Sequence, residues 1–198
     1  MSIAEKLTTV ADNQQRVYDA GKKAECDAFW DVFQQNGEPS NYYYAFAYGK
    51  FTDENYNPKH PIICKSGSTA AGSMFYNSTI TNTKVPITIP GASTQTFGNC
   101  SALKTIPLLT LTENTTYNNT FAYCSALEDI TIDGVIGQNG LDFSACKNLS
   151  HDSLQSILRS LENKTSGTFT LKLGAANIEK LPPSAIVSTS RKGWTLAE

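Results

Sequence analysis

A near-copy of one short segment constrains this chain more than any other feature of its sequence. The segment TFGNCSALKTI, beginning at Thr96, returns as TFAYCSALEDI, beginning at Thr120, so its apolar positions recur after 24 residues (120 minus 96). A weaker copy starts at Phe143, and a degenerate one precedes them at Met74. Periods of this length are typical of stacked supersecondary units, each too small to bury its apolar face alone. We therefore predict one shared interior line, formed by Phe97, Cys100, Leu103, Ile106, Phe121, Cys124, Leu127, Ile130, Phe143, Cys146 and Leu149.

Each repeat is also predicted to contain one strand. Ile130 and Ile132 alternate with the polar Thr131, as the residues of a half-buried strand do. One repeat earlier, the matching positions are Ile106 and Leu108. The copy before that offers Val85, Ile87 and Ile89. The alternative is a β-sandwich whose hairpins resemble each other by chance, but four copies in register favour a stack.

The pattern F-x-x-C-x-x-L-x-x-I, which runs from Phe97 to Ile106 and again from Phe121 to Ile130, resembles the BspA-type leucine-rich repeat of bacterial surface and phage-associated proteins. The resemblance implies an α/β fold with a short leucine-rich-repeat solenoid of about three to four turns over residues 71–149, in which altered terminal repeats act as caps. The first copy departs from the pattern, because Ser78 stands where the others have Cys and one extra residue precedes the strand. After residue 149 the pattern gives way to a helix.

The composition limits the classes of partner. Only 17% of the 198 residues are charged and the net charge is −2, whereas a nucleic-acid surface needs a basic patch or stripe. The chain has no apolar run long enough to span a membrane. Its N-terminal segment also lacks the basic and apolar regions of a secretory leader. We therefore expect no nucleic-acid partner, no membrane insertion and no standard secretion signal.

The five cysteines are predicted to be free thiols. Cys100, Cys124 and Cys146 hold equivalent places in successive repeats, where Cys serves as a small buried apolar residue. An odd number of cysteines without a secretion signal disfavours disulfides. A zinc site is the alternative, but the chain has no CxxC motif and no paired histidines. We expect no metal and no cofactor.

Residues 1–36 are predicted to form a helix of a different kind, a coiled coil. Apolar and small residues, with one polar Gln14 among them, follow an unbroken 4-3 spacing, as coiled-coil seam positions do, and Gly37 and Pro39 end the helix. We expect self-association as a homotrimer, by analogy with phage appendages; the alternative is an amphipathic helix lying on its own domain. The segment resembles N-terminal helices of small phage and prophage proteins from Gram-positive gut bacteria. Its predicted oligomerisation residues are Ile3, Leu7, Val10, Gln14 and Val17.

Residues 37–70 form an aromatic-rich connector. Rigid amphipathic aromatics suit binding surfaces, including surfaces that stack on sugars. The ordinary interpretation is that they form an N-terminal cap that shields the first strand of the solenoid. Both interpretations stay open. The candidate ligand surface consists of Tyr43, Tyr44 and Tyr48.

Residues 150–198 are predicted to form a C-terminal α/β cap. Ser150 is a good N-cap for a helix over residues 151–162, whose leucines and isoleucine share one face. A strand over 169–173, a second helix over 183–191 and a short strand over 194–196 follow. This tail resembles the endings of many such repeat proteins in gut Firmicutes and their phages.

The sequence predicts recognition rather than catalysis. It lacks the G-x-S-x-G, H-E-x-x-H, P-loop and Rossmann patterns. His60 has no carboxylate partner at a recognisable spacing, and His151 in a first helical turn is better explained by capping or packing. We expect a non-enzymatic protein of a phage or prophage virion that attaches to other virion proteins or to a host cell-surface protein or glycan. The alternative is a bacterial leucine-rich-repeat adhesin or interaction module in the cytoplasm or on the cell surface.

Overall fold

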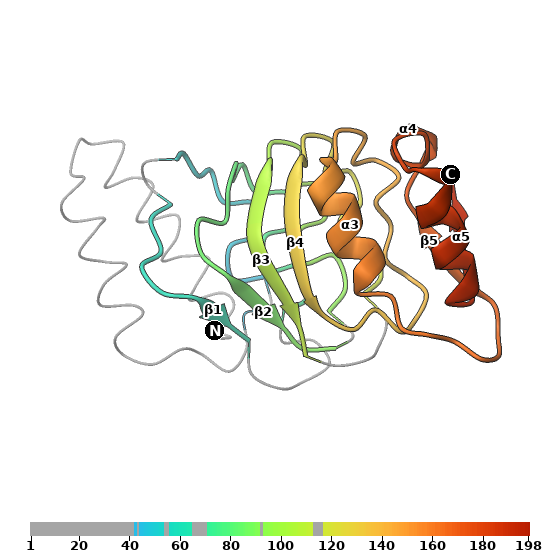
Figure 1. Cartoon of the computed structure of the whole chain (residues 1–198). Coiled ribbons are helices and arrows are strands. Elements are labelled where there is room, and N and C mark those ends of the chain that lie inside the picture. The colour runs from blue at the N-terminus through green and yellow to red at the C-terminus, as the bar shows by residue number, and fades with distance from the viewer. Residues whose placement is uncertain (1–41, 43, 54–55, 65–70, 92, 113–116) are drawn as a thin grey trace, which may run out of the picture.

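The computed structural model describes residues 42, 44–53, 56–64, 71–91, 93–112 and 117–198 (Figure 1). The predicted helix over 1–36, with all of its seam positions, lies outside the described residues, and so does Tyr43.

The repeats are joined by a parallel four-stranded sheet. Its strands are β1 (Ile62–Ile63), β2 (Ile87–Ile89), β3 (Thr105–Leu111) and β4 (Asp129–Gly134), which lie side by side in chain order (Figure 1). Every neighbouring pair is parallel. Hairpins produce antiparallel pairs, so the β-sandwich alternative is wrong. The register sets equivalent apolar residues next to one another across the sheet, in the row Ile62, Ile87, Leu109 and Ile132.

One strand position differs from the prediction. Ile132 pairs with Leu109 rather than with Leu108, because the register shifts by one residue after Ile106. Leu109 is fully buried, whereas Leu108 is only half-buried. The shift occurs at Pro107, which has no N–H to donate to a sheet ladder and is found in strands at bulges. The prediction that Leu108 faces the interior is therefore wrong.

A second backbone ladder holds the repeats together on the side away from the sheet. We call it the turn ladder, and it consists of the segments 44–48, 73–77, 95–99 and 119–123. Alternate N–H groups of each of the first three segments donate to carbonyl oxygens of the next repeat. The central bonds run from Phe46 N to Met74 O (2.8 Å), from Phe75 N to Thr96 O (2.8 Å) and from Phe97 N to Thr120 O (3.1 Å).

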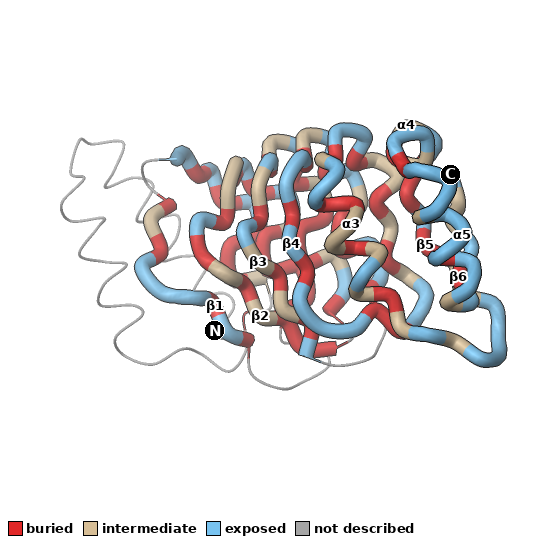
Figure 2. Tube along the Cα trace, in the orientation of Figure 1, coloured by how far each residue is buried: buried red, intermediate tan, exposed pale blue. Residues whose placement is uncertain are grey.

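Phenylalanine rings stack in a column between the two ladders. Successive ring centroids lie 5.1, 5.5, 5.8 and 4.7 Å apart, and the interplanar angles lie between 6° and 19°. Each ring is almost completely buried, and Figure 2 shows buried stretches through the interior of the stack with exposed stretches outside. Members of this column are Phe46, Phe75, Phe97, Phe121 and Phe143.

Helix α3 (His151–Arg159) lies along the outer edge of β4, where a fifth strand would otherwise pair (Figure 1). Ser150 is its N-cap and accepts a hydrogen bond from Ser153 N. The hydroxyl of Ser153 accepts from Ile130 N at 2.8 Å, and the hydroxyl of Ser156 accepts from Ile132 N at 2.8 Å. Side-chain oxygens of the helix therefore replace the carbonyls of a missing strand.

Beyond α3, the chain forms a small α/β unit at the C-terminal end of the stack (Figure 1). Strands β5 (Phe169–Lys172) and β6 (Trp194–Ala197) pair in parallel. Between them lie α4 (Ala175–Ile178) and α5 (Pro183–Arg191). Phe143 N donates to Lys172 O at 2.8 Å, so β5 continues the turn ladder. The last strand extends to Ala197, and α3 is shorter than the predicted 151–162 because the chain leaves the helix at Ser160.

Candidate interaction surfaces

The interior of the stack is a structural core in which the cysteines hold defined positions. The Cys100 thiol lies 2.9 Å from Phe75 O, and the Cys124 thiol lies 3.0 Å from Phe97 O. Phe97 O also accepts from Cys100 N within its own repeat, so both lone pairs of this buried carbonyl are used. A cysteine at this position is thus small, apolar and still able to donate to the preceding repeat.

These thiols are kept protonated. Burial raises the pKa of Cys100 to about 11 and that of Cys146 to about 12. Burial raises the pKa of Cys124 further, with a smaller contribution from the neighbouring Cys100 and Cys146 thiols. Cys64, Cys100, Cys124 and Cys146 are all free and buried. Because the thiolate is the reactive form of cysteine, they pack and donate hydrogen bonds rather than react.

All eleven residues of the predicted interior line are at most 2% exposed. The aromatic connector, in contrast, divides between the interior and the surface. Tyr42, Phe46, Phe51 and Tyr56 are buried in the core. Tyr44 is half-buried, and Tyr48 is 59% exposed. The structure therefore separates Tyr48 from the packing aromatics and brings it to the outside of the turn ladder.

Tyr48 is joined there by residues that the sequence did not single out. Its ring meets that of Tyr76 edge to face, with centroids 5.6 Å apart and an interplanar angle of 77°. The side chain of Asn99 donates from Nδ2 to the Tyr76 hydroxyl at 2.8 Å. Tyr123, one repeat further along, is 70% exposed. We call Tyr48, Tyr76, Asn99 and Tyr123 the tyrosine row.

The outer face of the sheet is the second candidate surface. Its exposed positions alternate with the buried core positions along β4, at Asp129, Thr131 and Asp133. Across the strands, Asp133 pairs with Thr110, and Thr110 pairs with Thr88. This face therefore carries short polar side chains on β2, β3 and β4, with the exposed Ile63 of β1 beside Thr88.

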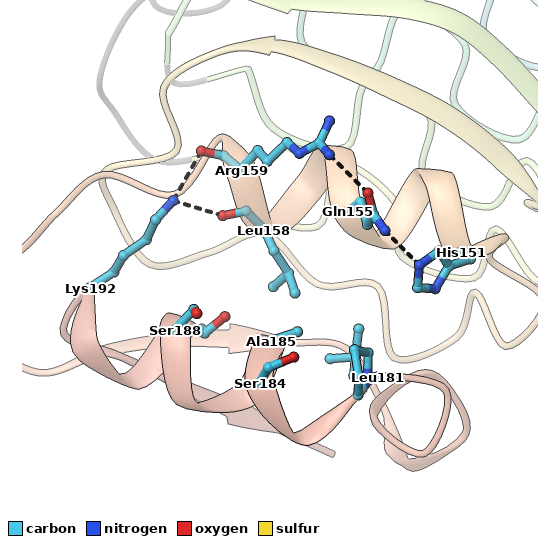
Figure 3. Close-up of a pocket in the computed structure, with 11 residues that line it drawn as sticks. His151, Gln155, Leu158, Arg159, Leu181, Ser184, Ala185, Ser188 and Lys192 are labelled. Atoms are coloured by element: carbon cyan, nitrogen blue, oxygen red, sulfur yellow. Dashed lines mark hydrogen bonds between the residues drawn. The ribbon is translucent and has the colours of Figure 1, made fainter.

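A groove of about 350 Å³ lies between α3 and α5 (Figure 3). Leu158 points from α3 toward Ala185 and Ser188 of α5 (Figure 3). Lys192 closes one end by donating at 3.0 to 3.1 Å to Leu158 O and Arg159 O, carbonyls at the C-terminal end of α3, and to Leu161 O just beyond the helix.

The polar side chains of this groove also bond to one another. Arg159 donates to Gln155 Oε1 at 2.9 Å, and Gln155 Nε2 lies 2.6 Å from His151 Nε2 (Figure 3). Burial lowers the pKa of Lys192, whose charge faces the carbonyl ends of α3. The groove is therefore part of the packing interface between α3 and α5, and His151 belongs to that interface.

Other kinds of site find no support in the described part of the chain. No group of three or more His, Cys, Asp or Glu side chains there is arranged to hold a metal ion. Within the same residues, no helix combines the length and the apolar character that crossing a membrane requires.

One sequence pattern, a tyrosine two residues after a phenylalanine of the column, indicates the tyrosine row, although the repeat period alone does not. Tyr123 stands two residues after the column residue Phe121, as Tyr48 stands two after Phe46. Phe46 was missed because it precedes Phe75 by 29 residues (75 minus 46), which is longer than the other periods. Only the ring stacking assigns it to the column.

The family comparison agrees with this architecture. The model of the BspA type leucine rich repeat region matches residues 62–180, with six copies. This chain belongs to the BspA-type leucine-rich repeat family. The resemblance noted in the sequence is thus confirmed, and the match begins before and ends after the predicted range 71–149. No curated protein and no solved structure matches the chain.

Membership of the BspA-type family indicates a general role in protein interaction or adhesion. Proteins of this repeat family act in protein interaction or adhesion and are generally not enzymes. The buried, protonated cysteines and the packing of His151 between α3 and α5 are consistent with a structural role for these residues.

Proposed function

We propose that this protein is a non-enzymatic recognition module that binds a partner protein through the outer face of its parallel sheet. The observation that carries this proposal is the closure of β4 by α3. Ser153 and Ser156 occupy the N–H groups of Ile130 and Ile132 at this edge, so a partner cannot add a strand there. The outer face of the sheet, on which Thr131 is an exposed residue of the edge strand β4, is left open to a partner.

The chemistry of this face suits a specific but moderate interaction. Thr88, Thr110 and Thr131 offer hydroxyl groups and methyl groups on a backbone that loses little entropy when a partner binds. Asp129 and Asp133 add negative charge on β4, which favours a partner with a basic complementary patch.

Lysine substitution on the sheet face tests this proposal. Thr131→Lys should reduce retention of a partner protein from solubilised cell envelopes or from disrupted phage particles by at least about tenfold, because it puts a long cation on the proposed contact face. The measurement is quantitative mass spectrometry of proteins retained on the immobilised full chain. Thr195→Lys, at an exposed threonine of β6, is the matched control and should retain the partner. Equal retention by both variants would exclude the sheet face.

We also propose that the protein belongs to a phage or prophage virion, as a tail, fibre or head appendage. The resemblance of its N-terminal and C-terminal segments to phage proteins and its low charge content support this place. A bacterial adhesin or interaction module is the second candidate, supported by the family match alone. Peptides of this chain in purified phage particles would favour the first, and peptides confined to the cell envelope would favour the second.

Residues 1–36 are proposed to hold three copies together. The 4-3 spacing from Ile3 to Val17 supports this assembly. Multi-angle light scattering should give three times the chain mass for the full protein and the monomer mass for a truncated protein that begins at Gly37. Monomers in both samples at micromolar concentration would show that the segment does not oligomerise.

A further inference from the structure

We propose that the tyrosine row on the turn ladder is a second binding surface, and that its ligand is a neutral glycan. This surface lies on the side of the stack away from the sheet, so the inference goes beyond the protein-binding face proposed above. Four side chains form it: Tyr48, Tyr76, Asn99 and Tyr123.

The exposure of these rings is selective. Tyr48 and Tyr123 are 59% and 70% exposed, whereas the phenylalanines at the adjacent column positions, Phe46 and Phe121, are buried. Both tyrosines also have a positive φ, 59° and 62°, a backbone conformation that residues other than Gly and Asn rarely adopt. Asn99 adopts the same conformation at the equivalent place. The ladder therefore directs a side chain outward at this place in each repeat, and two of these side chains are large aromatics.

Tyr76 is held in place before any ligand arrives. Its ring lies over Gly98, where an added Cβ would come within 3.2 Å of Tyr76 Cδ2. Asn99 donates to its hydroxyl, and Tyr48 packs against it edge to face. Contacts on three sides fix the rotamer, so binding costs less side-chain entropy than it would for a free tyrosine.

The spacing of the row follows the backbone ladder. Tyr48 N donates to Tyr76 O and Asn99 N donates to Ala122 O, both at 2.8 Å, so the row crosses successive repeats in order. Neighbouring parallel segments lie about 4.8 Å apart. Tyr48, Asn99 and Tyr123 occupy equivalent places of the ladder, and Tyr76 stands one residue before the equivalent Asn77. Side chains repeated along the stack suit a polymer of similar units lying along its axis.

The chemistry of the row selects a saccharide. A tyrosine ring offers an apolar face and a hydroxyl at its tip, which complement the C–H face and the hydroxyl groups of a pyranose. Asn99 and the exposed Ser101 and Ser125 add uncharged donors and acceptors beside the rings. The row contributes no ionisable carboxylate or ammonium group, so a neutral glycan fits it better than an acidic one.

A glycan microarray probed with the full chain, followed by calorimetric titration of a neutral oligosaccharide from the array, tests the inference. We expect binding to neutral glycans. Tyr48→Ala and Tyr123→Ala should each weaken it by about tenfold. Tyr123→Phe, which keeps the ring, should retain most of the affinity. Absence of binding to every neutral glycan, or unchanged affinity in both alanine variants, would overturn the proposal.

Two further variants separate this surface from the others. Ile186→Ala removes a 39% exposed apolar side chain of α5 and should leave glycan affinity unchanged. Thr131→Lys should also leave it unchanged, so glycan binding and protein retention can fail independently. Loss of glycan affinity in Thr131→Lys but not in Tyr123→Ala would assign the saccharide to the sheet face instead. Melting temperatures of all variants exclude unfolding as the cause of any loss.

Discussion

Phe121→Ala should destabilise the protein by about 3–5 kcal/mol, the largest loss we expect from a single substitution. Phe121 stands inside the phenylalanine column, 5.8 Å from the ring of Phe97 and 4.7 Å from the ring of Phe143. Removing it opens a cavity that backbone hydrogen bonds on both sides of the stack prevent from collapsing. It also deprives two further rings of a stacking partner. Urea unfolding followed by far-UV circular dichroism measures the change.

The control for this prediction lies two residues away. Tyr123→Ala removes an aromatic ring of similar size from the same turn, but that ring is 70% exposed, and surface substitutions usually change stability by no more than about 0.5 kcal/mol. If both variants lost the same stability, the column would not be the core of the stack. Leu127→Ala, at a fully buried residue, should cost about 2–5 kcal/mol for the same reason as Phe121→Ala.

Joint replacement of Ser153 and Ser156 by alanine should open the edge of the sheet. Each hydroxyl accepts a β4 N–H at 2.8 Å and donates to a carbonyl at the same edge. Ser153 donates to Glu128 O, just before β4, and Ser156 donates to Ile132 O within it. A buried backbone group that loses its partner costs about 1–3 kcal/mol. We therefore expect the free energy of unfolding of the double variant to fall by at least about that amount. Amide hydrogen exchange at Ile130 and Ile132 should accelerate at the same time.

The exposed edge should also promote association, since unpaired strand edges invite pairing with another chain. Sedimentation velocity on the double variant should show larger species than the natural sequence does. Ser188→Ala with Ser190→Ala, at exposed serines of α5, is the matched control and should change neither exchange nor association. Unchanged amide exchange at Ile130 in the first variant would mean that α3 protects β4 by packing alone.

The sequence by itself determined the unit and its interior. The 24-residue period placed Phe97 above Phe121, because residues at equivalent positions of a stacked repeat must meet the same neighbours. It also indicated why cysteine recurs at positions 100, 124 and 146, since a buried place of that volume suits a small apolar side chain. The BspA-type family could therefore be recognised from the residues of two copies.

Only the tertiary structure decided what lies between and around these positions. Pro107 in TIPLLTL favours an irregularity in the strand, but the one-residue shift that buries Leu109 in place of Leu108 is fixed only by pairing with β4. The serines of α3 read as ordinary polar positions of an amphipathic helix until the strand edge beside them is known. The tyrosine row is assembled from four segments of the turn ladder, and its members are separated by up to 75 residues (123 minus 48). Periodicity reports which residues share a neighbourhood within a repeating stack, whereas edges, shifts and surfaces arise from contacts between segments whose sequences do not resemble each other.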